Sequence, residues 1–248
     1  MGGLHLNGYD TSDITADSSS DRSQEVEWRD RITEAEGIRI GADGRPRCWW
    51  PGDDPLYVAY HDDEWGRPVD DDLRLFEKLC LEGFQSGLSW LTILRKRPNF
   101  RRAFAGFDRA VIAGFDDDDV ERLMADAGIV RNRAKILATI NNARRYPELV
   151  AETGSLAAYL WSFEPDPASR PATLDHQTLM TFGTSAESKA MSRDLRRRGW
   201  AFVGPTTAYA AMEAMGIVND HLDGCWARAE VERARASFRR PARLDRSG

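Results

Sequence analysis

The sequence predicts an all-α domain. Between positions 70 and 216, apolar residues recur at three- and four-residue intervals in several segments, which is the period of a helix with one buried face. The alternation of apolar and polar residues that marks a half-buried strand is hard to find. Breaks in the helical pattern coincide with the glycine and proline residues of PNF, PEL, PDPASRP and VGP. A chain of 248 residues with 42% hydrophobic side chains can bury a substantial core.

The predicted helices follow one another along this region. Residues 71 to 83, DDLRLFEKLCLEG, place Leu73, Phe76, Leu79 and Cys80 on one face, and Asp70 can cap the helix. Residues 116 to 128 form a helix with an acidic first turn, as the helix dipole favours. Three further segments have the same period: 130 to 145, 187 to 199 and 206 to 216.

Charge separates the two ends of the chain from its middle. Residues 1 to 40 carry nine acids against four arginines and are predicted to be a disordered acidic extension. Residues 228 to 248 carry seven arginines against three acids and are predicted to be a mobile basic tail or a frayed helix, either solvated or weakly attracted to a polyanion. The globular domain then spans residues 41 to 227. With a net charge of −6, the chain is not a nonspecific DNA-coating protein, so any nucleic-acid site must be local.

The compartment is expected to be the cytoplasm. No window approaches the roughly 18 apolar residues of a membrane span, and the N-terminus MGGLHLNGYDTSD has neither the basic start nor the apolar core of a secretory signal. The three cysteines are too few and too widely separated for a disulfide framework, which indicates a reducing environment.

One short connection is typical of a helix-hairpin-helix turn. In VERLMADAGIVRNRAKI, two amphipathic segments are joined across Gly128, with Arg131, Arg133 and Lys135 just beyond. Glycine permits a positive φ, and the free N–H groups at the start of the second helix can bind a phosphate. Many antiparallel helix pairs are joined in the same way without binding DNA, so this pattern alone leaves both interpretations open.

Four residues form a candidate zinc site. Cys48 and His61 lie near the start of the predicted domain, and His221 and Cys225 lie near its end, one helical turn apart. Two cysteines and two histidines are a tetrahedral zinc set with no open position, so the metal would be structural. The alternative is that the cysteines are small buried hydrophobes and the histidines only form hydrogen bonds.

Together, four segments resemble the DNA-3-methyladenine glycosylase I family of base-excision repair enzymes. They are CWWPGDDPLYVAYHDDEWG, LEGFQSGLSW, LMADAGIVRNRAKI and FVGPTTAYAAMEAMGIVNDHLDGC, in the family's order, and the similarity covers roughly residues 46 to 226. The resemblance implies a helical domain of the helix-hairpin-helix glycosylase superfamily, with structural zinc joining its two ends. It also implies an enzyme that acts on alkylated double-stranded DNA.

The resemblance further assigns a pocket for a flipped base. Glu82 matches the family's acidic base-recognition residue, and aromatic positions match at Trp50, Tyr57, Tyr60 and Trp90. The 3-methyladenine base carries a positive charge, so aromatic faces and a carboxylate should favour it over neutral adenine. Because the cationic base is already a good leaving group, Glu82, with Tyr60, need only orient and stabilise it while water attacks the sugar carbon.

Two neighbouring residues have more than one interpretation. Leu88 resembles the residue that fills the gap left by a flipped base, although a leucine beside a tryptophan is more often part of a core. Gln85 either forms a hydrogen bond with the base or lines the pocket wall. None of the four lysines of the sequence is suited to Schiff-base chemistry, so the enzyme is expected to be monofunctional and, by default, monomeric.

Two rival functions are considered. A helix-hairpin-helix module without catalysis would bind damaged and undamaged duplex alike and would not need an acid among aromatic rings. A zinc hydrolase would need an open metal position, which a complete set of four protein ligands does not leave.

Overall fold

Eleven α-helices make up most of the fold over residues 37–244, the part of the chain that the computed structural model describes. The predicted all-α class is confirmed, with one small addition, a two-stranded sheet. In chain order the elements are β1 (Ile38–Ile40), β2 (Pro46–Cys48), α2 (Pro55–Asp63), α3 (Asp72–Gln85), α4 (Trp90–Ala103), η2 (Ala105–Phe107), α5 (Arg109–Ala113), α6 (Asp117–Ala125), α7 (Arg133–Thr153), α8 (Leu156–Trp161), η3 (Pro167–Ser169), α9 (His176–Leu179), α10 (Ala186–Arg197), α11 (Pro205–Ala214) and α12 (Trp226–Ser237).

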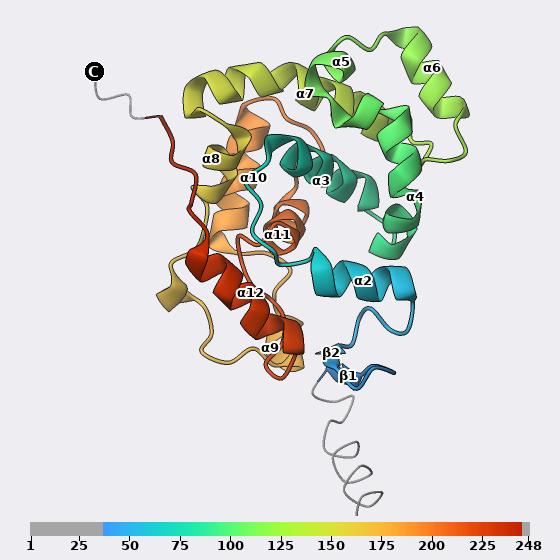
Figure 1. Cartoon of the computed structure of the whole chain (residues 1–248). Helices are drawn as coiled ribbons and strands as arrows, with labels where there is room; N and C mark the ends of the chain where they lie inside the picture. The colour runs from blue at the N-terminus through green and yellow to red at the C-terminus, as the bar shows by residue number, and fades with distance from the viewer. Residues whose placement is uncertain (1–36, 245–248) are drawn as a thin grey trace, which may run out of the picture.

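Helix α3 lies in the middle of the molecule and contacts α4, α7, α8 and α11 (Figure 1). It is buried on more than one face, because it has neighbours on several sides. Phe76, Leu79 and Cys80 are buried as predicted, whereas Leu73 lies in the first turn and is 38% exposed. The cap is Asp71, whose carboxylate accepts a hydrogen bond from the Arg74 N–H at 2.8 Å, instead of the predicted Asp70.

The first strands and the last helix of the described chain lie side by side. Strands β1 and β2 pair antiparallel, with Ile38 opposite Cys48, and the β2 strand contacts α12. Figure 1 shows the blue strands beside the red helix. Residues 37–40 therefore belong to the folded domain, although the extension was predicted to run to residue 40. The rest of that predicted extension lies outside the described residues.

The predicted basic tail also begins inside the folded domain. Helix α12 continues to Ser237, and its Val231 is fully buried. Arg235 forms an ion pair with Glu164 at 2.8 Å. The alanines of WARAEVERARAS favour a helix, and its small apolar stripe packs onto the domain. Among the described helices, none combines the length and apolar composition that a membrane span requires.

One carboxylate connects three helices. The side chain of Asp72, the first residue of α3, accepts hydrogen bonds from the backbone N–H groups of Leu156 at 3.0 Å and Ala157 at 2.8 Å. These are the first two residues of α8, so the negative charge also lies at the positive end of that helix. The Tyr146 hydroxyl of α7 donates a third hydrogen bond at 2.5 Å.

We expect Asp72→Ala to lower the free energy of unfolding by about 2 to 3 kcal/mol, because it removes a charged acceptor from two helix N–H groups and one phenol. Urea denaturation would measure the change. The matched control, Asp70→Ala, alters an exposed acid and should shift stability by less than about 0.5 kcal/mol. Equal unfolding midpoints for the two variants would contradict this role of Asp72.

Candidate functional site

Aromatic rings surround a pocket between α2, α3, α4 and α11. The ring centroid of Trp50 lies 4.9 Å from that of Tyr57, and the centroid of Tyr60 lies 5.4 Å from that of Trp90. The cavity has a volume of about 250 Å³. We call it the aromatic pocket, and its walls consist of Trp49, Trp50, Tyr57, Tyr60, Trp65, Glu82, Gln85, Trp90, Leu179, Ala210 and Glu213. The structure thus brings together all six side chains that the sequence assigned to a base pocket.

Helix α2 supplies two walls of this pocket. Asp54 caps the helix by accepting a hydrogen bond from the Tyr57 N–H at 3.1 Å, and Pro55 fixes the first turn. The Asp54 carboxylate also pairs with Arg95 of α4 at 2.5 Å, which holds the two helices together. Because residues three and four apart share a helix face, Tyr57, Tyr60 and His61 lie on the same side.

Glu82 is a buried carboxylate among these rings, with 5% of its surface exposed. One of its oxygens lies 3.1 Å from the Nζ atom of Lys78, one helical turn earlier on α3. Burial raises the pKa of Glu82, and the nearby ammonium of Lys78 acts in the opposite direction. The spacing of four residues was visible in the sequence, but the burial of the pair was not.

A second carboxyl group, Glu213 of α11, lines the pocket and was not predicted. Burial is the main cause that raises its pKa, and the charge of Asp220 and then that of Glu82 add to the effect. No sequence signal identifies Glu213, because α11 meets α3 only through the tertiary fold. The pocket therefore contains two carboxyl groups from different helices, and burial favours the protonated form of Glu213.

The turn between α3 and α4 presents Leu88 at the surface beside the pocket. Leu88 is 40% exposed, and the preceding Gly87 has a φ of +81°. The Gln85 side-chain amide donates a hydrogen bond to the Leu88 carbonyl at 3.0 Å, and the Leu88 N–H donates to the Gln85 carbonyl at 2.7 Å. Gln85 therefore lines the pocket wall and also braces the turn, and Leu88 is not a core residue.

The connection between α6 and α7 joins the two helices across Gly128 as predicted, but Gly128 does not adopt the positive φ that glycine was expected to provide there. Gly128 lies at its centre, where its N–H donates to the Asp126 side chain at 2.7 Å. Arg131 and Arg133 are exposed, and Arg133 pairs with Glu121. None of the three predicted hairpin residues lines the aromatic pocket.

Lys135 was grouped with these basic residues, but it points inward. Its ammonium donates hydrogen bonds to the carbonyl oxygens of Phe84 at 2.8 Å and Ser86 at 2.6 Å. These carbonyls end α3, where their helix partners are missing, so a buried cation is favourable there. Lys135 therefore connects the hairpin to the turn that carries Leu88.

The four predicted metal ligands form a buried cluster, which we call the Cys–His cluster. Their ligand atoms all lie within 4.8 Å of one another. The Cys225 sulfur lies 3.5 Å from His61 Nε2 and 3.6 Å from His221 Nδ1, and the Cys48 sulfur lies 3.9 Å from the same His221 nitrogen. Ligands at the corners of a tetrahedral zinc site lie about 3.3 to 3.8 Å apart, so the cluster can hold a metal ion.

The other ring nitrogen of each histidine also has a partner. His61 Nδ1 lies 2.8 Å from the Asp62 carboxylate, and His221 Nε2 lies 3.2 Å from the Trp65 carbonyl. The Asp62 carboxylate is itself held by Arg47, with bonds between 2.7 and 3.0 Å. Such outer partners orient histidines for metal binding.

The electrostatics of the cluster suit a cation. Hydrogen bonds from Cys48 and the two histidines lower the pKa of the Cys225 thiol. Burial lowers the pKa of His221, which favours the neutral ring that a metal needs. Burial and the neighbouring Cys225 raise the pKa of Cys48, since two thiolates side by side repel each other.

Two curated relatives of this chain are DNA-3-methyladenine glycosylases. Residues 50–229 match the family model described as methyladenine glycosylase. The DNA-3-methyladenine glycosylase 1 of Escherichia coli (strain K12) is 47% identical over 180 residues, covering 72% of this chain and 95% of that protein. The DNA-3-methyladenine glycosylase of Haemophilus influenzae is 43% identical over 180 residues, covering 72% of this chain and 96% of that protein.

Solved structures have the same fold. A crystal structure of 3-methyladenine DNA glycosylase I superimposes with a TM-score of 0.66 at 45% identity, covering 73% of this chain and 98% of that one. The Staphylococcus aureus enzyme gives a TM-score of 0.65 at 34% identity, covering 71% and 92%. A variant of 3-methyladenine DNA glycosylase I in complex with 3-methyladenine gives 0.62 at 33%, covering 71% and 93%.

Proposed function

The chain belongs to the methyladenine glycosylase family, and we propose that its aromatic pocket is where a base flipped out of DNA is bound and excised. The enzyme is a hydrolase of N-glycosyl bonds that removes 3-methyladenine from DNA. The observation that carries the assignment of the pocket is the Glu82 carboxylate, 5% exposed among aromatic rings. Burying an ionised carboxylate costs free energy unless an opposite charge compensates it, and a cationic base would supply such a charge.

The pocket selects the methylated base by its charge. Trp50, Tyr57 and Trp90 offer π faces, which attract a cation more strongly than a neutral base. Glu82 accepts a hydrogen bond from the exocyclic amine and complements the positive charge. Unmodified adenine is neutral, so it gains less from both interactions while the cost of desolvating the acid stays the same.

The reaction then needs little acid catalysis. As the N-glycosyl bond breaks, its electron pair moves to the base and cancels the positive charge. Water adds to the sugar carbon and loses a proton, which leaves an abasic site. Tyr60 assists by orienting the base: its hydroxyl accepts a hydrogen bond from Lys78 at 2.5 Å, which leaves its own proton to donate.

Contacts with the duplex come from two surface features. Leu88, presented on the turn beside the pocket, fills the space that the flipped base leaves. At the hairpin, the backbone around Gly128 and the side chains of Arg131 and Arg133 contact phosphates of alkylated double-stranded DNA. Both features are local, which suits a protein with a net charge of −6.

The metal of the Cys–His cluster is structural zinc. Two thiolates and two imidazoles are a zinc ligand set, and all four ligands come from the protein, so no position is open for substrate. When bound, the ion would join β2 and α2 to the segment before α12. Trp50 lies two residues after Cys48 and Tyr60 directly precedes His61, so the same ligands position the aromatic pocket.

The remaining proposals concern the reaction type, the oligomeric state and the cellular compartment. We propose a monofunctional enzyme, because Lys78, the lysine closest in sequence to Glu82, does not line the aromatic pocket. We propose a monomer, since one copy supplies every wall of that pocket. We place the protein in the bacterial cytoplasm, because the relatives come from bacteria and its three cysteines are free.

We expect Glu82→Gln to reduce release of 3-methyladenine from methylated duplex DNA by about 10- to 100-fold, because an amide keeps the shape but loses the charged acceptor. Duplex affinity should change much less, since Glu82 lies in the pocket and not at the hairpin. The assays are release of free base and a gel-shift titration. Glu148→Gln, which changes a glutamate whose side chain is 77% exposed on α7, is the matched control. Equal losses of excision and of binding would count against the assignment.

Leu88→Ala should slow excision from fully paired duplex by about 10-fold or more, because the side chain that fills the gap is lost. The loss should be smaller when the methylated base lies in a bulge, where less stacking is broken. Leu73→Ala is the control, since Leu73 has a similar exposure of 38% but lies at the opposite end of α3. A Leu88 variant equally impaired on both DNA substrates would not be explained by gap filling.

Purified protein should contain about one zinc per chain by elemental analysis. Cys225→Ala should lose the metal and lower the free energy of unfolding by about 3 kcal/mol or more, because loss of a structural metal is among the largest destabilising changes. Cys80→Ala, which removes a buried cysteine outside the cluster, should keep the zinc. Full zinc content in the Cys225 variant, or none in the wild type, would overturn the assignment.

A further inference from the structure

Lys78 is a lysine whose ammonium is enclosed by the protein. Its side chain is 14% exposed, and its Nζ atom lies 3.1 Å from a Glu82 oxygen and 2.5 Å from the Tyr60 hydroxyl. The same atom lies 3.4 Å from the centre of the Trp90 ring, close enough for a cation–π contact. All three partners are residues to which we assign base binding.

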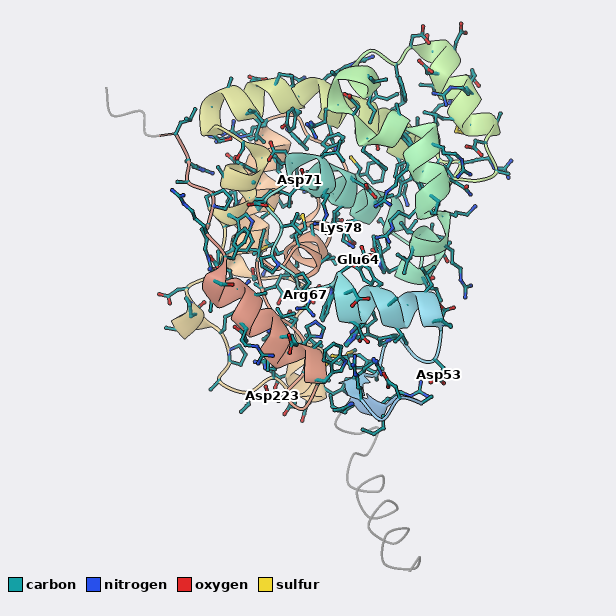
Figure 2. The ribbon with its side chains drawn as sticks, in the orientation of Figure 1. Asp53, Glu64, Arg67, Asp71, Lys78 and Asp223 are labelled. Carbon is teal, nitrogen blue, oxygen red and sulfur yellow. The ribbon has the colours of Figure 1, made fainter. Side chains whose placement is uncertain are left out.

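The ammonium contacts these residues from behind the pocket wall. Tyr60 and Trp90 line the aromatic pocket on one side, and on the other they line a cavity of about 50 Å³ with Lys78. Of these two cavities, Glu82 lines the aromatic pocket and Lys78 lines the rear cavity. Figure 2 shows Lys78 on α3 in the middle of the molecule, near Glu64 at the end of α2.

We propose that Lys78 is a positioning residue for base excision, which fixes the Glu82 carboxylate in the pocket wall and keeps it ionised for a cationic base. This inference rests on the role that we propose for Glu82. Lys78 itself touches neither the base nor the sugar.

Lys78 is the positively charged group beside Glu82, and the other groups that face this carboxylate are phenols and a carboxyl group. The groups that face Glu82 are the phenols of Tyr57 and Tyr60 from α2 and the carboxyl of Glu213 from α11. None of these is a cation, and Glu213 is a second acid. Behind Lys78 lie Glu64, the residue that follows α2, and Arg97 of α4, which pair with each other at 2.5 Å. Within the described residues, Lys78 is the cation that forms an ion pair with Glu82.

The titration behaviour of the pair supports the same role. Burial raises the pKa of Glu82, and Lys78 is what opposes that rise. Burial lowers the pKa of Lys78 to about 8, so its charge is present at neutral pH and is lost as the pH rises through 8. Lys78 therefore carries the charge that opposes the rise in the Glu82 pKa below about pH 8.

The test is the pH profile of base release by Lys78→Met, a substitution that keeps most of the side-chain volume and removes the charge. We expect the acid limb of kcat/KM to move upward by on the order of one pH unit, as removal of a close opposite charge implies. At neutral pH the variant should be slower than the wild type, and the two rates should converge above pH 8. Lys189→Met, at an exposed position on α10, should leave the profile unchanged.

A second variant separates positioning from folding. Lys78→Gln keeps a hydrogen-bond donor without the charge, and it should move the acid limb in the same direction as Lys78→Met. Both variants should weaken binding of free 3-methyladenine, measured by the fluorescence of the pocket tryptophans. In a Glu82→Gln background, neither variant should weaken binding further, because the carboxylate that Lys78 supports is already gone.

The outcomes distinguish this inference from the proposed function. If Glu82→Gln abolishes excision while the Lys78 variants lose activity by the same factor at every pH, Lys78 is only structural and the inference is wrong. If Glu82→Gln leaves excision intact, the proposed role of Glu82 fails first. A Lys78 variant with the wild-type acid limb and wild-type base affinity would also overturn the inference.

Discussion

Burial of the Glu82 carboxylate is the constraint on which the aromatic pocket depends. A carboxylate taken out of water loses hydration that only a close counter-charge or a bound cation can replace. The fold meets this need by placing Lys78 one turn earlier on the same helix, 3.1 Å away. Because α3 contacts helices on several sides, neither side chain can swing out to solvent. Glu82 therefore has a counter-charge before any base binds in the proposed pocket.

The Cys–His cluster concerns a second requirement of the aromatic pocket, which is that its walls keep their positions. Trp50 follows a strand of only three residues, and α2 is a nine-residue helix that contacts α4. Elements this short contribute little stability of their own. His61 and Cys48 connect them to a segment more than 150 residues later in the chain, so the walls gain rigidity from a distant part of the fold.

Much of this arrangement could be predicted from the sequence, but unevenly. The helices followed from apolar periodicity, and the metal ligands stood out because the chain has only four histidines and three cysteines. The burial of the Lys135 side chain could not be predicted, since it depends on carbonyl oxygens at the end of α3 that lack partners within the helix. Glu213 was missed because its place in the pocket depends on how α11 packs. The basic tail was assigned from charge alone, which does not reveal that Val231 is buried.

One face of helix α2 contributes side chains to two separate sites. Tyr57 and Tyr60 contribute to the aromatic pocket, and His61 belongs to the Cys–His cluster, at intervals of three and one residues. Each residue added to a helix rotates everything after it by about 100°. A single insertion or deletion between Tyr57 and His61 would thus turn either the rings or the imidazole away from its site. Substitutions at the outer positions of α2 leave this register intact, so the segment should tolerate changes of composition far better than changes of length.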